Sequence, residues 1–225
     1  MKSVSYCTTC KGRLWQLKQT LPVNIKETNE NCSIVLLDYH SEDGLQEYIN
    51  YNYQEYLDDG RLKYYKLLTP IDGFDMAFAK HIVHTLSNSD VLFNLDADNY
   101  IGSTLNELIA LKTGEMLVPK IVKGTDTARC GRIGFNRTDY LKINGYDIDL
   151  HDMTNDDGDI VYRARQAGIR FKFSEDLSIP VSQSCEDKFK FTRKTNYTLP
   201  DIVEVMNYQG TRFIVNLRNQ NTQTL

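Results

Sequence analysis

The chain has 225 residues, of which 41% are hydrophobic and 25% charged, and its formal net charge is −4. This balance is typical of a soluble globular protein and excludes a mostly disordered chain, a collagen, a coiled coil or a disulfide scaffold. The negative charge also argues against a nucleic-acid partner, because proteins of that class usually carry a basic excess on one face.

No apolar run approaches the roughly 20 residues that a membrane-spanning helix needs. The first residues lead directly into a strand-like segment and show no signal-peptide pattern. We therefore expect a cytoplasmic protein with no integral membrane segment.

The five cysteines fit free thiols in a reducing compartment. Cys7 and Cys10 form a CxxC pair, for which the sequence favours small residues at a strand end over a redox site.

Strand and helix patterns alternate along the first two thirds of the chain. We expect Pro22 and Asn24 to end the first helix and Asp43 to cap the second. This β-α order implies a mostly parallel sheet with helices on both faces. The expected strands are 3–9, 32–39, 62–68, 91–95 and 115–119, and the expected helices are 11–21, 43–57, 74–86 and 104–111.

The pattern changes after Cys130. Short elements follow, with an acidic loop between the second and third of them. The tail after residue 190 is rich in Asn and Gln, and the apolar residues of 202–206 favour a helix that packs back on the rest. We therefore predict a domain of residues 1–190 and a helical extension of residues 191–225. The short elements are a strand at 131–136, a helix at 138–143, a helix at 160–167 and a strand at 169–173.

Polar residues gather where the expected parallel strands end, which is the edge at which such sheets bind ligands. Asp96 and Asp98 directly follow a buried strand, and two carboxylates so placed can hold a hard divalent cation. Two other Asp-x-Asp patterns lack that context. Asp38 also ends a strand, where it either caps a turn or accepts hydrogen bonds from a base or sugar. The full set at this edge is Thr8, Thr9, Asp38, Asp96 and Asp98.

Two further groups are candidates for chemistry. Asp156 and Asp157 belong to a crowded acidic segment before a helix, and like charges raise the pKa of a carboxyl toward the range of a general base. The alternative is that these residues only interact with the helix dipole. Lys11 and Arg13 follow the first strand, where they either bind phosphate or form a solvated helix start.

Four segments resemble the family 2 glycosyltransferases, which have the GT-A fold. Residues 5–14 resemble their opening strand and loop, and residues 91–99 resemble their metal-binding DxD strand. Residues 132–147, which end in Asn144-Gly145-Tyr146-Asp147, are similar to a motif of the β-1,4-galactosyltransferase group. Residues 155–163 stand where that group has an acidic motif and a helix. The resemblance covers roughly residues 3–175 and implies an α/β, GT-A fold with helices flanking a mostly parallel sheet.

The resemblance also implies a reaction: a metal-dependent, inverting transfer of a hexose or N-acetylhexosamine from a UDP-sugar to a glycan or glycolipid acceptor. Asp98 would coordinate Mn²⁺ or Mg²⁺, and Asp96 would contact the metal or the ribose. Asp157 would be the general base and Asp156 would bind the acceptor. The nucleotide pocket would be formed by Thr8, Thr9, Lys11, Arg13 and Asp38.

The chain departs from the galactosyltransferase pattern in two places. Asp156 and Gly158 stand where that group has Glu and Asp, and no His follows His151 to act as a third metal ligand. These departures keep open a second hypothesis, a GT-A-like module that binds nucleotide-sugar or glycan without turnover. A nucleotidyltransferase is disfavoured because only Gly12 represents the expected Gly-rich loop.

Overall fold

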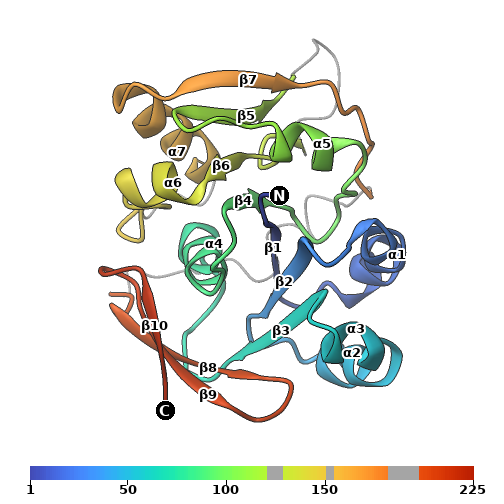
Figure 1. The fold of residues 1–225 in the computed structure, drawn as a ribbon. Helices are drawn as coiled ribbons and strands as arrows, with labels where there is room; N and C mark the ends of the chain where they lie inside the picture. The colour runs from blue at the N-terminus through green and yellow to red at the C-terminus, as the bar shows by residue number, and fades with distance from the viewer. Residues whose placement is uncertain (121–128, 151–154, 182–197) are drawn as a thin grey trace.

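The computed structural model describes residues 1–120, 129–150, 155–181 and 198–225 (Figure 1). These residues form one α/β domain built on a single sheet. The strands are β1 (Val4–Cys10), β2 (Cys32–Asp38), β3 (Leu62–Leu67), β4 (Val91–Asn94), β5 (Glu115–Pro119), β6 (Gly134–Asn136), β7 (Arg170–Ser174), β8 (Ile202–Asn207), β9 (Arg212–Asn216) and β10 (Asn221–Thr224). The helices are α1 (Leu14–Asn24), α2 (Leu45–Asn52), α3 (Gln54–Asp58), α4 (Met76–Thr85), α5 (Thr104–Ile109), α6 (Arg137–Lys142) and α7 (Asp156–Gln166), with a short 3-10 helix at Ile25–Glu27.

The ten strands follow the order β10-β9-β8-β3-β2-β1-β4-β6-β5-β7. The centre is parallel: β3, β2, β1 and β4 run side by side in one direction. On one side β6 is antiparallel to both β4 and β5, and on the other β8 is antiparallel to β3. The four central strands therefore end at one common edge, where the expected ligand site lies.

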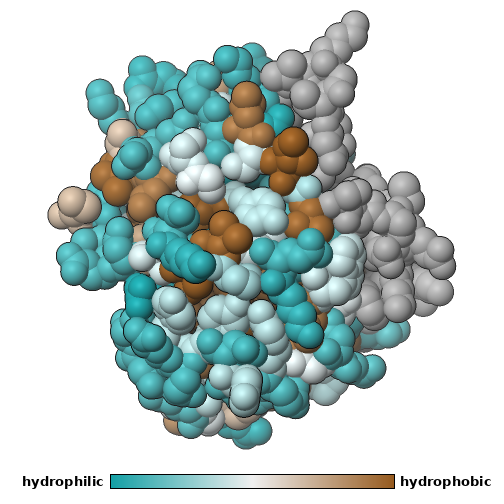
Figure 2. All heavy atoms as spheres, turned by 90° about the vertical axis from the view of Figure 1, so that its right-hand side faces the viewer, coloured by the Kyte–Doolittle hydropathy of each residue, from teal (hydrophilic) through white to brown (hydrophobic). Residues whose placement is uncertain are grey.

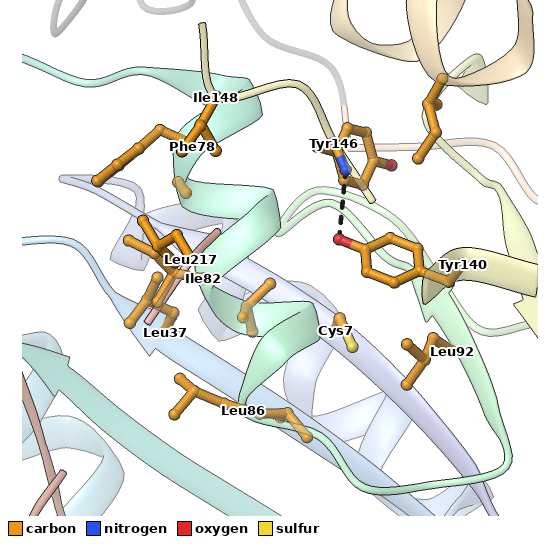
Figure 3. Packing of buried hydrophobic residues seen from close by; sticks show 14 of the residues in the cluster. Cys7, Leu37, Phe78, Ile82, Leu86, Leu92, Tyr140, Tyr146, Ile148 and Leu217 are labelled. Atoms are coloured by element: carbon orange, nitrogen blue, oxygen red, sulfur yellow. Dashed lines mark hydrogen bonds between the residues drawn. The ribbon is translucent and has the colours of Figure 1, made fainter. Parts of the chain in front are cut away.

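Two cores cover the two faces of the sheet. Successive residues of a strand point to opposite faces, so Tyr6 packs under α1, α2, α3 and α5, whereas Cys7 packs under α4. Figure 3 shows the second core, with α4 lying between Leu37 and Leu217 on one side and Cys7 and Tyr140 on the other. The face outside α1 to α3 is largely hydrophilic, and its hydrophobic side chains gather in its upper and middle parts (Figure 2).

The CxxC pair follows from this alternation. Cys7 and Cys10 are three residues apart on β1, so they lie in different cores, and both are buried with free thiols. Burial raises the pKa of each thiol, which makes both poor nucleophiles. The structure agrees with the prediction of small buried residues here and contradicts a redox pair.

Of two predictions about helix ends, one holds in part and the other is wrong. Pro22 lies inside α1, but the helix ends at Asn24, the second residue expected to stop it. The Asn24 side chain bonds the loop after β4: its Nδ2 donates to Asn99 O (2.9 Å) and its Oδ1 accepts from Ile101 N (2.9 Å). Asp43 does not cap the following helix. Its Oδ2 accepts from Leu14 N at 2.8 Å and so caps the start of α1. The single helix expected at 43–57 is two helices, α2 and α3, separated at Tyr53.

The predicted helix at 202–206 is a strand. Val203 and Val205 are buried while Ile202 is exposed, a period of two that fits a half-buried strand. This segment forms β8, which pairs with the free side of β3, and β9 and β10 continue the sheet. The proposed division at residue 190 lies outside the described residues. No helix among the described residues has the length and apolar character to span a membrane.

Candidate active site

A buried lysine joins three of the predicted carboxylates. Lys80 is in the middle of α4, where every residue from Ala77 to Thr85 is buried. Its Nζ lies 2.7 Å from Asp156 Oδ2, 2.7 Å from Asp157 Oδ1 and 3.9 Å from Asp96 Oδ1. The acidic segment and the DxD strand are thus brought together by a residue that the sequence analysis did not select.

The four side chains of this group differ in exposure. Lys80 and Asp156 are 2% and 6% exposed, whereas Asp157 and Asp96 are 24% and 27% exposed. Only Asp157 and Asp96 therefore reach the surface of the site. The buried position of Asp156 favours a role in binding Lys80 over the expected contact with an acceptor.

Asp96 and Asp157 face each other across Gly131. A Cβ on Gly131 would lie 2.6 Å from Asp96 Oδ2 and 3.0 Å from Asp157 Oδ2. The other oxygen of each carboxylate is engaged internally: Asp157 Oδ1 accepts from Lys80, and Asp96 Oδ1 accepts from Asn94 Nδ2 at 3.0 Å. Asn94 Nδ2 also donates to Gly131 O at 2.8 Å. Each carboxylate thus has one oxygen held by the protein and one turned toward the same small space.

Burial and the neighbouring charges together set the pKa values of Lys80 and Asp157. Burial alone would lower the pKa of Lys80, but the charges of Asp157, Asp156 and Asp96 hold that pKa well above its ordinary value. Burial raises the pKa of Asp157; the Lys80 ammonium opposes this, and the charges of Asp156 and Asp96 add to it. A carboxyl with a raised pKa that is partly open to the surface is suited to take up a proton.

Helix α7 places the two acidic residues at its start. It begins at Asp156, earlier than the sequence predicts, so that Asp156, Asp157 and Asp159 all lie in its first turn. The helix dipole stabilises carboxylates at that end. Asp159 forms an i,i+4 pair with Arg163 at 2.7 Å, so the dipole and this surface pair account for it without a catalytic role.

The second DxD carboxylate lies on a loop that is held in place by α1. Thr20 Oγ1 donates to Ala97 O at 2.7 Å, next to the Asn24 contacts described above. Asp98 is 6% exposed, and its Oδ1 accepts from Asn99 Nδ2 at 2.8 Å. Burial and the charge of Asp96 raise the pKa of Asp98 to about 6, and the charge of Arg13 acts against that rise. Arg13 therefore lies near enough to Asp98 for its charge to act on that carboxyl.

The remaining predicted residues lie apart from this group. Asp38 is fully buried; its Oδ1 accepts from Ser41 N and its Oδ2 from Tyr64 Oη, both at 2.7 Å. Thr8 is buried beneath the DxD loop, beside a cavity of about 10 Å³, and Thr9 is also buried. Lys11 is half-buried, with its Nζ 5.4 Å from the Tyr39 ring centroid. Burial lowers the pKa of Lys11, and Glu42, Asp38 and Asp72 counteract it.

The carboxylates fit a divalent cation that takes part of its coordination from elsewhere. No group of three or more His, Cys, Asp or Glu side chains within the described ranges is arranged to hold a metal ion. Asp96 and Asp98 nevertheless supply two hard oxygen ligands at one strand end. Mg²⁺ is commonly bound by one or two carboxylates together with substrate phosphates and water, so this pair fits such an ion.

Sequence reasoning missed Lys80, Asn94 and Gly131. The predicted helix at 74–86 contained a weak signal for the first of them: Lys80 lies between the apolar residues Phe78 and Ile82 of a helix with many apolar side chains, and a charge buried there needs a partner. Gly131 carries no local signal, because its backbone is not left-handed and only its distant neighbours reveal why a side chain is absent.

A scan against models of known protein families and a search of curated proteins find no match. Solved structures do match. S. aureus TarS 1-349 aligns with a TM-score of 0.63 and 14% identity over 84% of this chain and 63% of that one. The same TarS fragment in complex with UDP-GlcNAc aligns with a TM-score of 0.62 and 13% identity, covering 87% of this chain and 60% of that one.

The mannosyltransferase PcManGT from Pyrobaculum calidifontis, in complex with GDP-Man and Mn²⁺, aligns with a TM-score of 0.62 and 16% identity over 78% of this chain and 55% of that one. This chain thus spans less than two thirds of the length of each of these structures. At such identities the likeness shows the fold: the α/β, GT-A-like architecture expected from the sequence is confirmed.

Proposed function

We propose that this protein is a glycosyltransferase that moves a sugar from a nucleotide-sugar donor to an acceptor hydroxyl. The observation that carries the proposal is the convergence of the DxD carboxylate Asp96 with Asp157 at the carboxyl edge of a GT-A-like sheet. The complexes of similarly folded proteins with UDP-GlcNAc and with GDP-Man support a donor of this class. The finer prediction, a hexose or N-acetylhexosamine carried by UDP, rests on the sequence resemblance.

The residues divide the chemistry between them. Asp98 and Asp96 would hold Mn²⁺ or Mg²⁺, which when bound neutralises charge on a departing diphosphate. Asp157 Oδ2 takes the proton of the acceptor hydroxyl as that oxygen forms a bond to the anomeric carbon and the bond from this carbon to the diphosphate breaks. Attack from the side opposite the leaving group inverts the anomeric configuration, and the acceptor is a glycan or glycolipid.

A second candidate is a module that binds nucleotide-sugar or glycan without turnover. Two observations favour it. The described residues hold no group of three metal ligands, and one oxygen of the candidate base Asp157 is engaged by Lys80. A binding module would keep the donor intact, so the two functions differ in whether the nucleotide diphosphate is released.

The test combines donor binding with turnover. Purified protein is titrated with UDP-Gal, UDP-Glc, UDP-GalNAc, UDP-GlcNAc and GDP-Man in Mn²⁺, Mg²⁺ or EDTA, and thermal stability and nucleotide release are both measured. A ligand that binds the native state raises the melting temperature. We expect a metal-dependent shift with one donor and slow release of its nucleotide diphosphate. Absence of any shift would contradict both the transferase and a module that binds nucleotide-sugar.

Two substitutions separate chemistry from donor binding. Asp157→Asn should lower transfer by roughly 10²- to 10⁴-fold, the usual contribution of a general base, while donor binding stays unchanged. Asp98→Asn should instead weaken metal-dependent donor binding itself. The matched control is Asp59→Asn, the same chemical change at an exposed residue whose carboxylate pairs with Arg61. Equal and mild effects of Asp157→Asn and Asp98→Asn would overturn the assigned roles.

A further inference from the structure

The ammonium of Lys80 is surrounded by groups of the site. A lysine has three N–H donors. Two of them make 2.7 Å bonds to Asp156 and Asp157, and the Asp96 carboxylate lies 3.9 Å away. The Tyr146 ring covers another side, with its centroid 5.5 Å from Nζ. At 2% exposure this ammonium cannot reach a substrate, so any part that it plays in transfer must act through the carboxylates.

Stability alone does not explain a charge at this position. The attraction within a buried ion pair does little more than offset the cost of removing the two charges from water. Apolar residues of similar size are therefore often equally stabilising or better. The other buried side chains of α4 are apolar or small, apart from the uncharged imidazoles of His81 and His84, whose pKa values burial lowers. A methionine would suit the surroundings of the Lys80 stem but would leave Asp157 Oδ1 without its donor.

We propose that Lys80 is a positioning residue that sets the orientation of the base. It fixes Oδ1 of Asp157 against the buried Asp156, and this fixes Oδ2 at Gly131 opposite Asp96 Oδ2. The assignment rests on the proposed function, in which Asp157 Oδ2 accepts the proton of the acceptor. Asp156 serves in this arrangement as the second anchor of the ammonium rather than as a contact of the substrate.

The test removes the anchor without leaving an unbalanced charge. Lys80→Met alone leaves two carboxylates without their cation, one of them buried, and is expected to lower the melting temperature. It is therefore not the decisive variant. The double variant Lys80→Met/Asp156→Asn removes one positive and one negative charge together. Its reference is Asp156→Asn, which keeps Lys80 and its bond to Asp157.

Two readouts are compared between the double variant and Asp156→Asn. The first is the crystal structure, which shows where Asp157 Oδ2 lies relative to Gly131. The second is steady-state kinetics with the donor found in the panel above. We expect Oδ2 to turn away from Gly131 in the double variant and kcat to fall about 100-fold below that of Asp156→Asn, the size of effect that misplacement of a catalytic group by about 1 Å produces. The KM for the donor should not change.

The outcomes separate this inference from the proposed function. An Asp157 that keeps its place in the double variant, or a kcat within about twofold of Asp156→Asn, overturns the positioning role, because a purely charge-balancing lysine would give that result. A displaced Asp157 in a protein whose wild type turns over no donor would uphold the structural role of Lys80 while the proposed function fails.

Discussion

Asp38 and Asp96 are both associated with the carboxyl ends of central strands, and the structure gives them opposite roles. Asp38 ends β2 and is fully buried, with one oxygen bonded to Ser41 N and the other to Tyr64 Oη. Asp96 follows β4 and is partly exposed; the protein engages its Oδ1, and its Oδ2 faces the space beside Gly131. The strand end determines where a carboxylate lies, and the number of internal donors around it determines whether it is available to a ligand.

The same rule applies within the acidic pair. Asp156 and Asp157 are neighbours on α7 and share the Lys80 ammonium, yet only Asp157 is substantially exposed. Asp156 resembles Asp38 in that it is buried and hydrogen-bonded inside the protein. A carboxylate of this chain is therefore a candidate for catalysis when it has one oxygen held by a short internal bond and a second oxygen directed to the surface.

Within this comparison, the largest effect should come from replacing each of the two strand-end carboxylates, one at a time, with an amide. Asp96→Asn should lower transfer by about 100-fold or more, since even changes to residues that contact only the ligands of a metal cost about 10- to 100-fold. It should leave stability nearly unchanged. Asp38→Asn should do the reverse, because it weakens buried bonds to a charged group that contribute roughly 1.5 to 3 kcal/mol. Steady-state kinetics and urea unfolding of both variants measure the contrast. A large loss of kcat in well-folded Asp38→Asn would restore the nucleotide-binding role expected from the sequence.

A methyl group at Gly131 should disturb both outward oxygens at once. In Gly131→Ala the new Cβ would approach Asp96 Oδ2 and Asp157 Oδ2 to 2.6 and 3.0 Å, so both carboxylates must shift. We expect transfer to fall roughly 10- to 100-fold with a small change in melting temperature. The control is Gly158→Ala on α7, where the Cβ would meet only the Asn155 side chain. Similar transfer rates for the two variants would show that the reaction does not depend on the space beside Gly131.

The acid dependence of the rate should report the environment of Asp157. Burial raises its pKa, and the base must be ionised, so the protonated, inactive form persists to a higher pH than for an ordinary aspartate. On acidification kcat/KM should therefore fall tenfold per pH unit, starting above the usual Asp range. The rate is measured from pH 4.5 to 8 with melting temperatures alongside to exclude unfolding. A profile that stays flat down to pH 4.5 would contradict the assignment of Asp157 as base.

The sequence predicts the parallel half of this fold well, because buried strands of four to seven residues alternate with amphipathic helices there. It fails at residues 202–206, where the alternating apolar positions of β8, a strand between β9 and β3, can also be read as a helical face. It selects Asp96, Asp156 and Asp157 as candidates but not Lys80, the residue that joins these three. Lys80 lies 76 residues from Asp156, and no local pattern encodes a contact at that separation. For the same reason Ser41 and Tyr64, the partners of Asp38, could not be predicted.

The smallest effect should come from removing the Tyr64 hydroxyl, which donates a hydrogen bond to Asp38. It should appear only in the free energy of unfolding. Tyr64→Phe removes the 2.7 Å donor to Asp38 Oδ2 and leaves that buried oxygen unsatisfied, which costs about 1 to 3 kcal/mol. The transfer rate should not change, because Asp38 has no open side. Tyr208→Phe deletes the same atom from a Tyr–Asp bond at the surface, where Tyr208 Oη donates to Asp58 Oδ1 at 3.1 Å, and water can replace it. Equal free energies of unfolding for the two variants, measured in urea, would mean that Asp38 is solvated, and its place in the comparison with Asp96 would be lost.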